Sequence, residues 1–170
     1  MSFRISRSTF LAAAAVAVTG SAASADLFTF TYTDTNGLVA SGNLVANDNG
    51  NGLTMTCVAG DITITTGPVT GTFNLVPGGG SDGSFAWDNL LYTGPATLDI
   101  YGLLFTDGST EVNIWGNGGP NNYSAWMAPP NWFYQGEQIG TFVISPSVPA
   151  PGAAAMLGVG LLASARRRRV

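Results

Sequence analysis

The chain has 170 residues, a formal net charge of −4, one cysteine, and neither histidine nor lysine. All six basic residues are arginines, at positions 4, 7 and 166 to 169, whereas all ten acidic residues lie from Asp26 to Glu137. Segment 26–147 therefore has a formal charge of −10, which excludes nucleic acid as a favoured partner because its phosphates require cationic side chains. The side chains that most often act as general bases near neutral pH are also missing.

Residues 1–25 have the order of a secretory signal peptide. Two arginines precede nine apolar residues at 10–18, and the small residues Ala23 and Ala25 stand directly before Asp26. We expect a signal helix that enters the Sec translocon, with signal peptidase cleaving between Ala25 and Asp26. A retained anchor is the alternative, but nine apolar residues are fewer than the ~20 that a spanning helix needs.

Residues 26–147 have the size of one domain and the alternation of β-strands. Apolar residues recur at every second position in 28–32, 62–64 and 73–75, with threonine or asparagine between them. Turn formers such as "DTNG", "NDNGNG" and "NGGPNN" separate these runs every 8 to 12 residues. The pattern predicts an all-β domain of about ten short strands, either an antiparallel β-sandwich or a meander barrel.

Cys57 lies in the strand-like run "LTMTCV", at the same parity as Leu53 and Met55. A single cysteine cannot form a disulfide within the chain. We interpret it as a buried and unreactive thiol, with an intermolecular bridge as the alternative.

Four acidic residues, Asp88, Asp99, Asp107 and Glu111, could meet across neighbouring strands. A pair of carboxyl groups is the machinery of glycoside hydrolases, so a carboxylate-dependent hydrolase is one hypothesis. Most acids, however, stand in turn sequences such as "TDGS", where capping of the backbone explains them. We therefore expect no catalytic residues.

The loops "NDNGNG" and "GGGSDG" are rich in oxygen ligands, which calcium prefers. Neither has the spaced acidic ligands of an EF-hand or a glycine-rich calcium repeat, and we interpret them as hairpin loops. We expect no cofactor and no metal site, with calcium as the alternative.

Aromatic residues are concentrated in 115–134, among glycine, proline and asparagine. We interpret these rings as covering an open end of the β core. The alternative is a glycan contact, because flat rings beside amide side chains suit the faces of sugars. The candidate glycan-binding residues are Trp115, Tyr123, Trp126 and Trp132.

Fourteen small or apolar residues at 152–165 are followed by Arg166, Arg167, Arg168 and Arg169. As a helix, this stretch would measure ~21 Å, short of the ~30 Å hydrocarbon core, although arginine side chains and local thinning of the bilayer reduce the mismatch. Because positive residues stay cytoplasmic, the arginines predict a stop-transfer signal that anchors the chain transiently in the inner membrane. A permanent anchor is the alternative.

Two prolines, a short apolar segment and a terminal arginine cluster, behind a signal peptide, resemble the PEP-CTERM sorting signal over residues 148–169. The matching motif is Val148, Pro149, Ala150, Pro151 and Gly152, with Ala150 where the family usually has glutamate. The resemblance implies processing by an exosortase, a membrane protease or transpeptidase, and a Gram-negative-type bacterium. Residues 88–126 loosely resemble uncharacterised secreted proteins with the same tail.

These features together predict three segments, a signal peptide at 1–25, a secreted all-β domain at 26–147 and a sorting signal at 148–170. We expect a non-catalytic protein at the cell surface or in the extracellular polysaccharide matrix, with a structural role. A carbohydrate-binding module that contacts exopolysaccharide is the first alternative, and a glycoside hydrolase is the second.

Overall fold

The computed structural model describes residues 25–128 and 139–147, which form eleven β-strands. The strands are β1 (Asp26–Asp34), β2 (Val39–Asp48), β3 (Thr54–Thr66), β4 (Gly71–Leu75), β5 (Gly80–Ser81), β6 (Ala86–Trp87), β7 (Leu90–Tyr92), β8 (Leu103–Thr106), β9 (Glu111–Gly119), β10 (Asn122–Ala128) and β11 (Gly140–Pro146).

Eight of these strands close into an antiparallel barrel, in the order β2-β1-β11-β10-β9-β8-β4-β3, with β3 pairing back to β2. β7 extends the sheet from the first residues of β3, and β5 and β6 form a separate hairpin. Closure gives each of the eight strands a partner on both sides, which protects backbone groups that an open sheet would expose at its edges.

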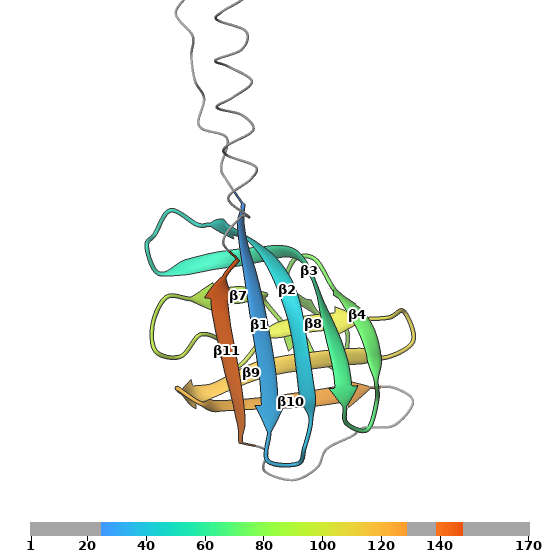
Figure 1. Cartoon of the computed structure of the whole chain (residues 1–170). Helices are drawn as coiled ribbons and strands as arrows, with labels where there is room; N and C mark the ends of the chain where they lie inside the picture. Colours follow the sequence, from blue (N-terminus) through green and yellow to red (C-terminus); the bar gives the residue numbers. More distant parts are fainter. Residues whose placement is uncertain (1–24, 129–138, 148–170) are drawn as a thin grey trace, which may run out of the picture.

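The barrel has two groups of strands that run across one another (Figure 1). β11, β1, β2, β3 and β4 lie side by side, and β8, β9 and β10 cross behind them. The corners are narrow, because β10 meets β11 only at Tyr123 and Gly140, and β4 meets β8 at two pairs of residues. This geometry is that of two orthogonally packed sheets with the core between them.

The alternation in the sequence fills this core. In β1, Phe28, Phe30 and Tyr32 point inward and are at most 9 % exposed, while the threonines between them face solvent. The Phe30 ring stacks on Phe142 of β11, with ring centroids 5.1 Å apart. Aromatic contacts of this kind stabilise a core beyond the burial of apolar area alone.

A second, smaller apolar cluster lies outside the barrel, against the outer face of β8 and β10. Phe85, next to β6, is buried there against Leu104 and Ala128, and Trp87 and Trp126 pack at its margin. The β5-β6 hairpin therefore covers part of the barrel wall, and it belongs to an excursion of the chain between β4 and β8.

Asn89 fastens this excursion to the barrel. Its side chain is fully buried, donates to the carbonyl oxygens of Val76 and Gly78 at 2.6 Å each, and accepts the N–H of Leu104 at 3.2 Å. Its backbone oxygen accepts the N–H of Cys57 at 2.8 Å. Asn89 has a positive φ of 54°, which asparagine tolerates better than most residues.

The prediction of an all-β, antiparallel domain is confirmed, and the architecture is a closed barrel. The expected signal helix and membrane helix lie outside the described residues. Within the two described ranges, no helix is long and apolar enough to cross a membrane.

Candidate ligand-binding sites

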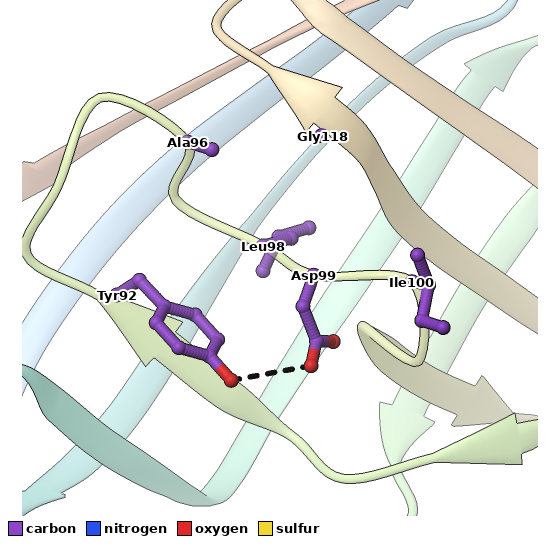
Figure 2. A pocket seen from close by; sticks show the side chains of 6 residues that line it. All are labelled: Tyr92, Ala96, Leu98, Asp99, Ile100 and Gly118. Atoms are coloured by element: carbon purple, nitrogen blue, oxygen red, sulfur yellow. Dashed lines mark hydrogen bonds between the residues drawn. The ribbon is translucent and has the colours of Figure 1, made fainter.

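One pocket lies between the loop that joins β7 to β8 and the end of β9 (Figure 2). Its volume is about 190 Å³. The lining residues are Tyr92, Ala96, Leu98, Asp99, Ile100 and Gly118. Most of this lining is apolar, and the carboxylate of Asp99 with the hydroxyl of Tyr92 forms its polar side.

The pocket loop is held against the end of the barrel by backbone contacts. Leu98 is buried, and the N–H of Thr97 donates to the hydroxyl of Tyr123 at 3.0 Å. The N–H of Gly116 donates to the backbone oxygen of Asp99 at 2.6 Å. A side chain at position 116 would collide with the Leu98 carbonyl oxygen, so glycine allows this close approach.

Asp99 is the centre of a small polar network. One carboxylate oxygen accepts the N–H groups of Tyr101 and Gly102, at 2.9 and 3.1 Å, and the other accepts the hydroxyl of Tyr92 at 3.2 Å. The carboxyl of Asp88 also hydrogen-bonds to Asp99. Burial, followed by the charge and hydrogen bond of Asp99, raises the pKa of Asp88 to about 6.

Two further carboxyl groups interact, that of Asp82 at the tip of the β5-β6 hairpin and that of Glu111 in β9. Burial, followed by the hydrogen bond and charge of Asp82, raises the pKa of Glu111 to about 7. Although burial acts in the other direction, the N–H groups of Phe85 and Ser84 lower the pKa of Asp82. The Asp82 and Glu111 pair therefore shares a proton near neutral pH.

Of the four acids considered for catalysis, the structure brings Asp88 and Asp99 together. Glu111 pairs instead with Asp82, and Asp107 caps its own turn by accepting the N–H groups of Ser109 and Thr110. Hydrogen-bonded carboxyl groups lie closer than the ~5 Å or more that separates the two carboxyls of glycoside hydrolases. The Asp88 and Asp99 pair therefore does not have the spacing of that chemistry.

Trp115 and Trp126 meet on the outer face of β9 and β10, edge to face, with ring centroids 5.6 Å apart. Both are partly exposed. The indole N–H of Trp115 donates to Asn117 at 3.1 Å, and the Asn117 amide donates to Ser124 at 2.9 Å and to Asn122 at 3.3 Å. The rings thus lie beside a network of amides whose orientation is already fixed.

Tyr123 does not belong to this face. It is 1 % exposed and packs inside the barrel, where its ring lies 5.7 Å from that of Phe142. The expectation that this ring is a surface glycan contact is therefore wrong, because alternation along β10 turns Tyr123 inward and Trp126 outward. Trp132 lies outside the described residues.

The two oxygen-rich loops bind their own backbone. In the β2-β3 loop, Asp48 accepts the N–H of Gly50, and Asn51 accepts those of Leu53 and Thr54. Asp82 does the same in the β5-β6 hairpin. Among the described residues, no three acidic, histidine or cysteine side chains are grouped as metal ligands.

Three residues of these networks were not singled out from the sequence, namely Tyr92, Asn89 and Asp82. Tyr92 and Asn89 stand in the run "DNLLY", whose asparagine before two leucines is the only local indication of a buried amide. Of the sorting residues, Asp26 begins β1. The following lie outside the described residues: Ala23, Val148, Pro149, Ala150, Pro151, Gly152 and Arg166 to Arg169.

Comparison with known proteins adds no relative to this picture. No protein-family model, curated protein or solved structure matches the chain.

Proposed function

We propose that this chain is a non-catalytic, secreted β-barrel domain that is sorted to the cell surface or extracellular polysaccharide matrix by signals at its two ends. Signal peptidase acts at the N-terminal signal, and an exosortase-type membrane protein acts at the Pro149 to Pro151 motif. The tail holds the chain in the inner membrane until that step.

The observation that supports this proposal is where the barrel strands begin and end. β1 begins at Asp26, the first residue after the expected signal cleavage, and β11 ends at Pro146, just before the sorting motif. β1 and β11 are neighbours, with Phe28 opposite Pro146, and the N–H of Ser147 donates to the Leu27 carbonyl oxygen at 2.6 Å. Cleavage at both expected positions therefore removes no described strand.

The test is mass spectrometry of the protein recovered from culture supernatant and from membranes of the native host. We expect the released form to begin at Asp26 and to end between Val148 and Pro151. A variant with serine at positions 166 to 169 should lose the stop-transfer signal and reach the supernatant with its tail uncut. Supernatant copies of the native protein that carry the intact arginine tail would contradict the proposal.

Carbohydrate binding is the second candidate function, and the Trp115 face favours it. An indole ring beside fixed Asn117 and Asn122 amides offers stacking and hydrogen bonds together, the combination that sugar rings require. Replacing Trp115 tests glycan binding more directly than replacing Trp126, since Trp126 also packs against the second apolar cluster.

Affinity electrophoresis in purified exopolysaccharide measures this activity. We expect Trp115→Ala to lose most of the retardation, and Leu53→Ala, which removes an exposed apolar side chain at the β2-β3 loop, to keep it. If both variants are retarded as strongly as the wild-type protein, with unchanged thermal unfolding, the Trp115 face is excluded as the glycan site.

A further inference from the structure

The pocket beside Asp99 has the size and walls of a binding site for a small ring. Its volume is about 190 Å³. An apolar cavity of about 150 Å³ is large enough to take up benzene. The side chains of Ala96, Leu98 and Ile100 supply apolar contacts, and Ile100 is 66 % exposed beside the pocket. A ligand that covers Ile100 would remove this apolar surface from water.

The electrostatics of the pocket favour a positive charge. Asp99 lines it, and the Asp88 carboxyl interacts with Asp99 through its charge and a hydrogen bond. Segment 26–147 contains ten acidic residues and no lysine, arginine or histidine, so the domain itself supplies no cationic side chain to neutralise this pair. A charge brought by a ligand would fill that role.

We propose that this pocket binds a small organic ammonium ion, with its ring or alkyl body against Leu98 and Ile100 and its N–H groups directed to the Asp99 carboxylate. This site is separate from the expected sorting signals and from the Trp115 face. It gives the domain a ligand class that neither of those features implies.

Other ligand classes fit less well. A sugar needs several hydrogen-bonding groups around its ring, and the lining of this pocket is mostly apolar. A calcium ion needs six or more oxygen ligands, and the lining of this pocket does not supply them. Anions are repelled by Asp99 and by the acidic domain around it.

The probe is benzylammonium, compared with benzyl alcohol, which has the same ring and no charge. Isothermal titration calorimetry on the full chain in detergent micelles should show benzylammonium binding at least about tenfold more tightly, as expected for a charge-assisted hydrogen bond. Its affinity should rise between pH 5 and 7.5, because Asp88, whose pKa is raised to about 6, loses its proton there and adds negative charge beside Asp99, while the amine stays protonated.

Matched variants locate the binding. Asp99→Asn keeps an oxygen that can accept the N–H groups of Tyr101 and Gly102, so it removes the charge and leaves the turn. It should weaken benzylammonium binding about tenfold, because the variant removes the charge that the amine contacts. Asp107→Asn, the same change in a similar turn away from the pocket, should have no effect on binding.

Ala96→Trp should fill the pocket and prevent binding of both probes, because Ala96 lies on its wall. Thermal unfolding of each variant confirms that it is folded, and the comparison of Asp99→Asn with Asp107→Asn stands without Ala96→Trp. The proposal is overturned by equal affinity for the two probes, by unchanged binding to Asp99→Asn, or by no heat of binding at millimolar benzylammonium.

Discussion

The side-chain oxygen of Asn89 accepts the backbone N–H of Leu104 at 3.2 Å, inside the wall between the excursion and β8. Leu104 is fully buried, and its own backbone oxygen accepts the N–H of Val76 at 2.8 Å. One asparagine therefore connects the chain after β4 to the strand that resumes the barrel. Without it, the buried N–H of Leu104 and the partly buried carbonyl oxygens of Val76 and Gly78 would lose a partner.

Asn89→Gly tests this connection without backbone strain, because glycine adopts positive φ freely. We expect the free energy of unfolding to fall by roughly 2–4 kcal/mol, since buried polar groups are left unpaired. Urea denaturation measures this. Asn121→Gly is the matched control, at a φ of 56° on an exposed turn, and should change stability by less than about 0.5 kcal/mol.

Gly116→Ala should displace the pocket loop from the end of the barrel. The added methyl group would meet the Leu98 carbonyl oxygen, and relief of this clash costs about 1–3 kcal/mol. Hydrogen exchange should then be faster at the amide of residue 116, which donates to Asp99. Gly119→Ala has open space around it and should leave exchange unchanged.

The two carboxyl pairs predict that stability declines from mildly acidic to neutral pH. The folded pKa of Glu111 is raised to about 7 and that of Asp88 to about 6, so their contributions are complete below the ordinary carboxyl range and are lost as the pH rises through those values. The lowered pKa values of Asp82 and Asp107 act oppositely, and their contributions are lost in stronger acid. Maximum stability should therefore lie at about pH 4–5.

Glu111→Gln should raise the free energy of unfolding at pH 7.5 and flatten this decline. The gain should be on the order of 1 kcal/mol, a small value because solvent screens the partly exposed pair. Asp107→Asn should have the opposite effect and lower the stability at that pH, because the pKa of Asp107 is lowered by the folded turn. A wild-type profile that rises steadily from pH 4.5 to 7.5 would contradict the raised pKa values of Glu111 and Asp88.

Cys57 should be unreactive in the folded protein. It is fully buried, and burial, followed by the charge of Asp88, raises the pKa of its thiol to about 12. Alkylation by iodoacetamide at pH 8 should be roughly a thousandfold slower than in urea. Because the chain has one cysteine, the labelled mass reports this site alone; rapid labelling without urea would indicate that the strand bearing Cys57 opens.

The strands could be predicted from the sequence because alternation is a local property. β1 shows this most clearly, with Phe28, Phe30 and Tyr32 turned into the core as expected. The choice between a sandwich and a closed barrel could not be predicted, since it depends on contacts between distant residues. The corner at Tyr123 and Gly140 is a single pair, and no local pattern identifies it.

Some features of the candidate sites could be predicted from the sequence. The run "NYSAWMA" alternates, so the opposite directions of Tyr123 and Trp126 follow from treating it as a strand rather than an aromatic loop. The meeting of Asp88 with Asp99 is different, because eleven positions separate them and the 93–102 loop must fold back on β7 to bring them together. Turn capping by Asp107 was the correct local expectation.

The neighbouring positions of β1 and β11 also determine how the domain responds to tension. The two strands are antiparallel and their outer ends, at Phe28 and Pro146, form one rung of the ladder. A force that pulls residues 25 and 147 apart would load the hydrogen bond between Ser147 and Leu27 first, then this rung and each next pair in turn, down to Asp34 and Gly140. The barrel would unzip from that seam at low force, whereas a domain pulled from opposite ends of two paired strands must break the whole ladder at once.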